Sequence, residues 1–159
     1  MNQARFTSLA FLATTAIFLL LAGKPVQADL CSKTTFVKLC RPLLKGIRSP
    51  AYATEVATKS LINEIGRARN VLGRSLTPKT ADMCRENYDN AIDSLKKALK
   101  SLKVRDLYIV SINLSATLTN IVTCDDAIKA ASNPVKRINL RLRGLASNCL
   151  ALAEMTPSH

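Results

Sequence analysis

The sequence predicts an all-α fold: an antiparallel, up-down-up-down four-helix bundle with a short N-terminal helical hairpin extension and two disulfides. Three observations favour this class. Four long segments repeat apolar residues every three or four positions, which is the period of a helix with one buried side. Short breaks separate these segments, and none alternates apolar and polar residues as a half-buried strand does. The chain also has only 5 glycines among 159 residues, which favours long helices over many tight turns.

Residues 1–28 are typical of a secretory signal peptide. Arg5 precedes a short apolar run at 6–23, and Val-Gln-Ala at 26–28 forms a small-residue cleavage site. The run is interrupted by threonines and a serine, which argues against a membrane anchor. We therefore predict export, with residues 29–159 as one mature domain.

The mature chain is strongly basic. The 23 Lys and Arg residues, less Arg5 and Lys24 of the signal peptide, face 11 acids, which leaves a formal charge of +10. For an exported protein this charge favours acidic polysaccharides, anionic membranes or acidic proteins as partners. We expect no nucleic-acid partner, because export separates the chain from DNA and RNA and no zinc-finger spacing or aromatic stacking motif is present.

Residues 29–50 are expected to form the helical arm and 51–159 the bundle. The first bundle helix is predicted over 54–76, ending at Thr77-Pro78, with these apolar positions: Leu61, Ile65, Ala68 and Leu72. The second is predicted to begin near Ala81, with this buried stripe: Cys84, Tyr88, Ala91, Leu95, Ala98 and Leu102. The third is capped by Asp106 and buries Leu107, Val110, Leu114, Leu118 and Ile121. The fourth follows Asn133-Pro134 and buries Val135, Ile138, Leu142, Leu145, Cys149 and Leu152.

Five cysteines remain after export, which predicts two disulfides and one thiol, with fifteen pairings open to counting alone. Cys31 and Cys40 are expected to staple the arm. Cys84 lies about 19 residues before the turn near 103–104 and Cys124 about 20 after it, so antiparallel helices bring them to the same end. Cys149 lies on an apolar face and is predicted to be a buried free thiol.

We predict no enzymatic activity, no cofactor and no metal site. The single histidine is His159, the last residue, where chains are seldom held rigidly. The sequence contains no CxxC, HExxH, GxSxG or phosphate-binding glycine loop. The usual nucleophilic and metal-dependent reactions therefore lack their residues.

An acidic stripe lies on the second helix in this basic chain. Its residues follow at steps of four, three and four, opposite the buried stripe: Asp82, Glu86, Asp89 and Asp93. Two interpretations stay open. The acids, together with lysines in the helix's C-terminal half, can simply match the helix dipole, or they can form a docking surface for a basic protein.

Two further features have both a structural and a functional interpretation. Asn113-Leu114-Ser115 is a glycosylation sequon within a predicted helix. The last helix begins with a basic series that is either solvated or binds acidic polysaccharide: Lys136, Arg137, Arg141 and Arg143.

Taken together, the motifs of the mature chain resemble those of the plant invertase and pectin methylesterase inhibitor family over its whole length. The resemblance rests on five stretches: Cys31 and Cys40 with eight residues between them, Cys84-x-Glu86-Asn87-Tyr88 running into Ala91-Ile92-Asp93-Ser94-Leu95, Leu114-Ser115-Ala116, Thr123-Cys124, and Leu145-Ala146-Ser147-Asn148. The resemblance implies disulfides between Cys31 and Cys40 and between Cys84 and Cys124. It also implies a secreted, non-enzymatic inhibitor that is located in the apoplast and cell wall and is expected to be a monomer.

The resemblance also implies a mode of binding. In the pectin methylesterase branch, the second and third bundle helices lie across the enzyme's active-site cleft in a one-to-one complex. Mapped by motif, the partner-binding residues here are Glu86, Asn90, Asp93, Thr123 and Asp126.

Two alternatives to a pectin methylesterase inhibitor remain. Invertase-directed members often carry a Pro-Lys-Phe loop before the last helix, whereas this chain has Asn133-Pro134-Val135-Lys136, so acid invertase is the second choice of target. A basic module that binds acidic polysaccharide, such as acidic pectin, or anionic membrane is the alternative from another class.

The interval from Cys40 to Cys84 is about a dozen residues shorter than the family usually has, which predicts a trimmed first helix or connection.

Overall fold

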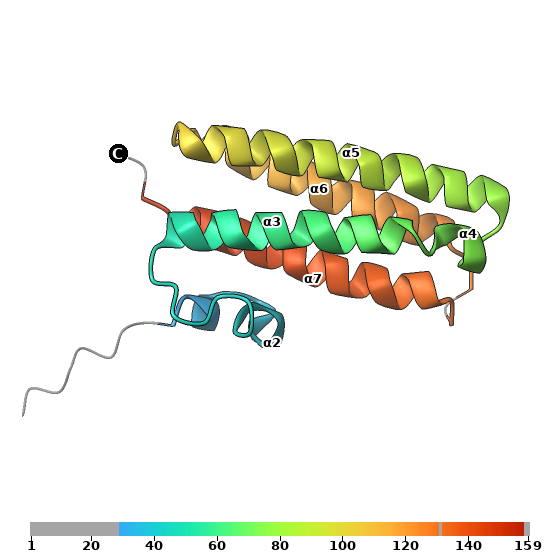
Figure 1. The fold of residues 1–159 in the computed structure, drawn as a ribbon, viewed down its shortest axis with the longest axis horizontal. Coiled ribbons are helices and arrows are strands. Elements are labelled where there is room, and N and C mark those ends of the chain that lie inside the picture. The colour runs from blue at the N-terminus through green and yellow to red at the C-terminus, as the bar shows by residue number, and fades with distance from the viewer. Residues whose placement is uncertain (1–28, 131, 158–159) are drawn as a thin grey trace, which may run out of the picture.

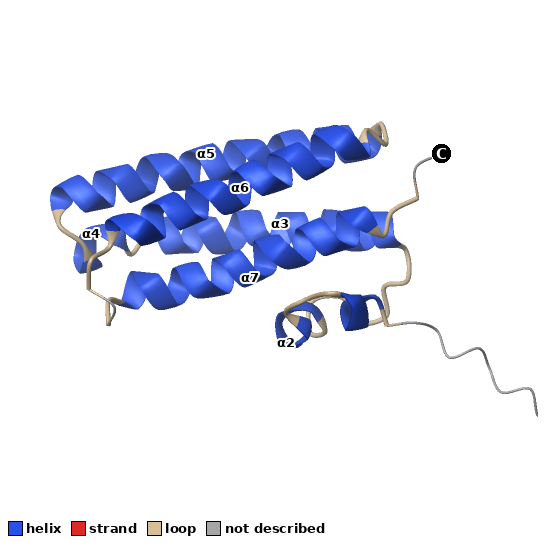
Figure 2. Cartoon of the chain, turned by 180° about the vertical axis from the view of Figure 1, so that it is seen from behind, coloured by secondary structure: helices blue, strands red, loops and turns tan. Residues whose placement is uncertain are grey.

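The structure is a computed structural model that describes residues 29–130 and 132–157. The predicted signal peptide and His159 lie outside these residues. The described part contains four long helices: α3 (Pro50–Arg69), α5 (Pro78–Lys103), α6 (Leu107–Ala127) and α7 (Pro134–Glu154). They lie side by side along the long axis of the molecule, each antiparallel to the next (Figures 1 and 2). The predicted four-helix bundle is confirmed, and the described residues contain no strand.

Each long helix begins where a polar side chain accepts a hydrogen bond from its first turn. The caps are Ser49 to the Tyr52 N–H, Thr77 to Thr80, Asp106 to Ile109 and Asn133 to Val135. A proline follows three of them, at a position where its missing N–H costs nothing. Thr77-Pro78, predicted as the end of the first helix, is therefore the start of the second, and α5 begins at Pro78 rather than near Ala81.

The prediction of one helix over 54–76 was wrong at both ends. α3 already begins at Pro50, ends at Arg69, and is followed by a one-turn helix, α4 (Leu72–Ser75). Asn70, a poor helix former, directly follows the last residue of α3, so the chain turns here at little cost. The turn still buries Leu72, and the Asn133 amide holds the end of α4 by donating to the Ser75 carbonyl at 2.8 Å.

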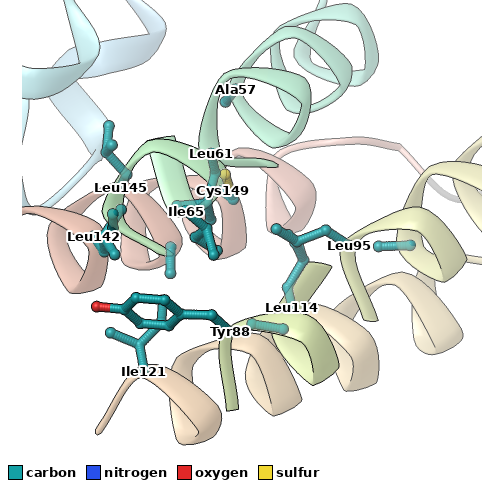
Figure 3. Close-up of a cluster of buried hydrophobic side chains, with 14 of the residues drawn as sticks. Ala57, Leu61, Ile65, Tyr88, Leu95, Leu114, Ile121, Leu142, Leu145 and Cys149 are labelled. Carbon is teal, nitrogen blue, oxygen red and sulfur yellow. The ribbon is translucent and has the colours of Figure 1, made fainter. Parts of the chain in front are cut away.

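All four long helices contribute to a single core, shown in Figure 3. Its labelled side chains are Ala57, Leu61, Ile65, Tyr88, Leu95, Leu114, Ile121, Leu142, Leu145 and Cys149. The stripe predicted for α5 is confirmed, except that Leu102 is half-buried. In α6 and α7 the predicted Leu107, Leu118 and Ile138 are only half-buried, while Thr117, Cys124 and Asn139 are buried. The true stripe of α7 passes through Asn139, which the prediction skipped because it is polar.

Helix α6 is long and apolar enough to cross a membrane by length and composition. In this structure it packs against both α5 and α7. Its buried side includes Val110, Leu114 and Ile121, and the Thr117 hydroxyl donates to the Ala91 carbonyl of α5 at 3.4 Å. The buried apolar residues of α6 thus serve the bundle core, whereas Tyr108 and Ile112 on its outer side are exposed.

The N-terminal arm is a hairpin of a short 3-10 helix, η1 (Leu30–Lys33), and α2 (Val37–Cys40), joined by the Cys31–Cys40 disulfide. It lies against α7 (Figure 1). The Asn148 side chain bonds the main chain of Phe36 twice, accepting from its N–H at 3.0 Å and donating to its carbonyl at 2.9 Å. Gly144 permits the close approach, because a Cβ there would lie 2.8 Å from Leu39 Cδ1.

We predict that Asn148→Ala destabilises the protein by about 1–3 kcal/mol, because it leaves the Phe36 main chain unpaired at the joint between arm and bundle. Chemical denaturation of the oxidised protein measures this. The control is Asn87→Ala, whose amide bonds only the Met83 carbonyl of its own helix. Equal effects of the two substitutions would show that the arm is not held by Asn148.

Candidate functional site

The disulfide Cys84–Cys124 sets how α5 and α6 lie against each other. Its Cα atoms are 4.7 Å apart, and it joins the N-terminal part of α5 to the C-terminal part of α6. This is the pair predicted from the helix lengths. By the loss of chain entropy in the unfolded state, a bridge across 40 residues contributes about 4 kcal/mol of stability.

The five predicted partner-binding residues are all exposed and lie on these two helices. Glu86 is two residues beyond Cys84, while Thr123 and Asp126 flank Cys124, so these three gather around the bridge. Asn90 and Asp93 lie further along α5, roughly 6 and 10 Å from Glu86 by helical rise. We call the exposed side formed by these residues and the neighbouring outer side of α6 the α5/α6 face.

Helix α6 contributes an uncharged ridge to this face. No Asp, Glu, Lys or Arg occurs from Leu107 to Cys124, although the chain carries a formal charge of +12. The exposed residues recur at steps of four, three, four and four: Tyr108, Ile112, Ser115, Thr119 and Thr123. Because an uncharged ridge loses little solvation energy on contact, it is typical of the centre of a protein interface.

The acidic stripe of α5 is exposed as predicted, but ion pairs with neighbouring cations reduce its charge. Asp82 pairs with Arg85, Asp93 with Lys96 at 3.3 Å, and Asp89 with Arg69 of α3 at 2.8 Å. Asp89 is thus engaged on the α3 side of its helix, away from α6. Glu86 and Asp126 take part in no ion pair within the described residues, so the uncompensated negative charge lies beside the disulfide.

A buried polar network, which the sequence did not predict, supports this end of the face. The Tyr88 hydroxyl of α5 donates to Asn139 Oδ1 of α7 at 2.5 Å, and Asn139 Nδ2 donates to Asp125 Oδ1 of α6 at 3.4 Å. Arg143 pairs with Asp125 at 3.6 Å. Burial, and secondarily the charge of Asp125, raises the pKa of Tyr88 far above its usual value, so the phenol remains a neutral donor.

Tyr88, Asn139 and Asp125 join three helices directly beneath the bridge. The sequence could have pointed to this network through the position of Asn139. Asn139 lies four residues after buried Val135 and three before buried Leu142, on the buried stripe of α7. A polar residue at such a position needs a buried partner, but the sequence cannot say which helix supplies it.

Cys149 is buried and unpaired, as predicted for the fifth cysteine. Burial raises the pKa of its thiol to about 12, outweighing the opposing hydrogen bond with Thr58. The reactive thiolate is therefore scarce at neutral pH. Cys149 acts as a core residue.

The sequon asparagine and part of the basic series of α7 already form hydrogen bonds or ion pairs within the protein. Asn113 is half-buried, and its Nδ2, the atom that would carry a glycan, donates to the Ile109 carbonyl at 2.8 Å. Its glycosylation stays a prediction. Arg141 lies 3.8 Å from Glu64, and Arg143 pairs with Asp125, so two of the four cations at the start of α7 are matched by acids.

Fold and surface together define a disulfide-locked helical bundle with an exposed face suited to contact with another protein. The chain belongs to the plant invertase/pectin methylesterase inhibitor family, whose model matches residues 26–152. A pectinesterase inhibitor of Actinidia deliciosa is 24% identical over 145 residues, covering 82% of this chain and 78% of the relative.

Solved structures share the fold. A mutant form of a pectin methylesterase inhibitor from Arabidopsis superposes with a TM-score of 0.70 at 19% identity, covering 82% of this chain and 97% of that one. A pectin methylesterase inhibitor from Arabidopsis thaliana gives a TM-score of 0.64 at 18% identity, covering 86% and 99%.

We predict that Tyr88→Phe and Asn139→Leu each cost about 1–3 kcal/mol of stability, because each leaves a buried polar partner unpaired. The double variant should cost less than the sum, by at least about 0.5 kcal/mol, since both partners are then apolar. Denaturation of the four proteins completes the cycle. Strict additivity would mean that the two side chains do not support each other.

Proposed function

We propose that this chain is a secreted inhibitor of pectin methylesterase in the cell wall. It covers the enzyme's active-site cleft with the α5/α6 face, in a reversible, non-covalent, one-to-one complex, and so limits the de-esterification of pectin. The observation that carries the proposal is the uncharged ridge of α6 beside the unpaired acids Glu86 and Asp126. The family match and the pectinesterase inhibitor among its relatives support it.

Inhibition by steric occlusion suits a rigid surface. The Cys84–Cys124 bridge and the Tyr88 network fix the three helices before the enzyme arrives. Little conformational entropy is then lost on docking, so more of the contact energy appears as affinity. No covalent bond to the enzyme is required, and the inhibitor family gives no reason to expect catalysis by the chain itself.

Thr123 is the proposed central contact. It is exposed beside the bridge, and its hydroxyl already donates to the Thr119 carbonyl at 3.0 Å. Because this donor is satisfied within the helix, the side chain can enter a pocket of the enzyme without leaving a hydrogen bond unmade. Glu86 and Asp126 provide polar contacts around it, and Asn90 and Asp93 extend them along α5, towards the polar rim.

Inhibition of acid invertase is the second candidate, since the family includes invertase inhibitors. The stretch that would carry the invertase-binding loop is here the first turn of α7. Asn133 caps the helix, Pro134 begins it, and Val135 is fully buried. Asn133 and Val135 are therefore engaged in the bundle, which favours the esterase as target.

We predict that Thr123→Trp weakens inhibition of a plant pectin methylesterase by at least about a hundredfold, because the larger ring blocks the central contact. Steady-state inhibition constants measure this. The control is Leu140→Trp, an equally bulky change at an exposed site of α7. It should leave inhibition within about threefold of the parent.

Full inhibition by Thr123→Trp would exclude Thr123 as the central contact. If Leu140→Trp abolished inhibition while Thr123→Trp did not, the inhibitory surface would lie on α7 instead of the α5/α6 face.

A further inference from the structure

A second surface feature lies on the other side of α5 from α6. A groove of about 350 Å³ runs between the N-terminal half of α3 and the C-terminal half of α5. Its lining includes Ser49, Tyr52, Glu55, Lys59, Leu102 and Lys103. Along α5, Lys103 is 17 residues from Glu86, roughly 25 Å by helical rise. The groove is thus separate from the proposed contacts around the disulfide, and Asp93, the proposed contact nearest to it along α5, is 10 residues from Lys103, roughly 15 Å by helical rise.

The walls of the groove combine an aromatic ring with aliphatic side chains. Tyr52 is 55% exposed, although it lies in a helix of the bundle, and Leu99 and Leu102 are half-buried beside it. The C–H face of a sugar ring packs well against such surfaces, because a tyrosine presents a flat apolar body with a polar tip. The Ser49 hydroxyl and the Glu55 carboxylate add hydrogen-bonding groups at the edge.

Cations surround the groove in excess of acids. Lys59 and Lys103 line it, and Lys96 and Lys100 precede Lys103 by seven and three residues on α5. Two acids offset them in part, since Glu55 pairs with Lys59 and Asp93 with Lys96. Lys100 and Lys103 form no ion pair within the described residues. A ligand with repeated negative charges fits this arrangement better than a neutral sugar.

We propose that this groove binds a chain of uronic acids, an acidic polysaccharide with one carboxylate on each sugar. The tyrosine packs on a sugar ring while Lys103, which forms no ion pair within the described residues, binds a carboxylate. A concave groove favours a polysaccharide over a membrane surface, because membrane binding needs apolar side chains that protrude. De-esterified pectin has this chemistry, and naming it rests on the proposed function. The protein would then be retained on stretches of pectin whose carboxylates the target enzyme has already released from their methyl esters.

Calorimetric titration of the mature, oxidised protein with polygalacturonate fragments tests this, at low salt because the contacts are ionic. The matched probe is the same fragments with their carboxyls methyl-esterified. The variants are Tyr52→Ala and Lys103→Ala. Their controls are Tyr108→Ala, which removes an exposed tyrosine of α6, and Lys79→Ala, which removes an exposed lysine from the other end of α5.

We expect the acidic fragments to bind at least about tenfold more tightly than the esterified ones, and each groove variant to lose about fivefold in affinity. The two controls should bind as the parent does. If the controls lost as much affinity as the groove variants, the binding would be a general attraction by net charge, and the proposed groove site would be wrong. Equal affinity for esterified fragments, or binding to anionic lipid vesicles without binding to the acidic fragments, would also overturn it.

Esterase inhibition by the two groove variants, Tyr52→Ala and Lys103→Ala, separates the two proposals, provided that the assay uses a short substrate that the groove does not retain. Retained inhibition with lost fragment binding supports two independent sites. Fragment binding by a parent protein that inhibits no esterase would leave the groove assignment in place and contradict the proposed function.

Discussion

The disulfide between Cys84 and Cys124, with the polar network beneath it, locks three of the four long helices together. The bridge fixes the antiparallel register of α5 and α6 at one end, and the network of Tyr88, Asn139 and Asp125 adds α7 to the same joint. At the other end, α5 passes to α6 through a tight turn with Arg105 at a φ of 58° and Asp106 capping α6. Between these two ends the helices cannot slide.

A fixed register converts a helical pattern into a surface. The uncharged ridge of α6 and the acids of α5 come from two different helices, and the bridge between Cys84 and Cys124 holds them in one face. A rigid face also costs little entropy to dock. The same helix α5 is basic in its C-terminal half, so it carries opposite charge at its two ends. The acidic N-terminal half of α5 can therefore contact an enzyme, while its basic C-terminal half binds a separate acidic ligand.

Much of this architecture could be predicted from the sequence. Helical periodicity located the core of α5 almost residue by residue, and simple helix lengths paired Cys84 with Cys124 before any resemblance was considered. Both inferences use properties local to one or two helices, where spacing alone determines direction. The boundary at Thr77-Pro78 was assigned to the wrong helix, because a threonine followed by proline both ends one segment and caps the next.

What could not be predicted depends on partners far away in sequence. Asn139 is a polar residue whose place in the core is understandable only once Tyr88 and Asp125 are seen to meet it. Likewise, the pairing of Asp89 with Arg69 separates that acid from the face to which its spacing assigned it. The α3/α5 groove was missed for the same reason, since its tyrosine and lysines belong to two helices.

The most direct test of the central claim is a titration of the purified, oxidised mature protein against a plant pectin methylesterase and, in parallel, an acid invertase. Esterase activity should fall to a plateau at one inhibitor per enzyme, while invertase activity should be unchanged. Inhibition of the invertase alone, or of neither enzyme by a protein that circular dichroism shows to be folded, would contradict it.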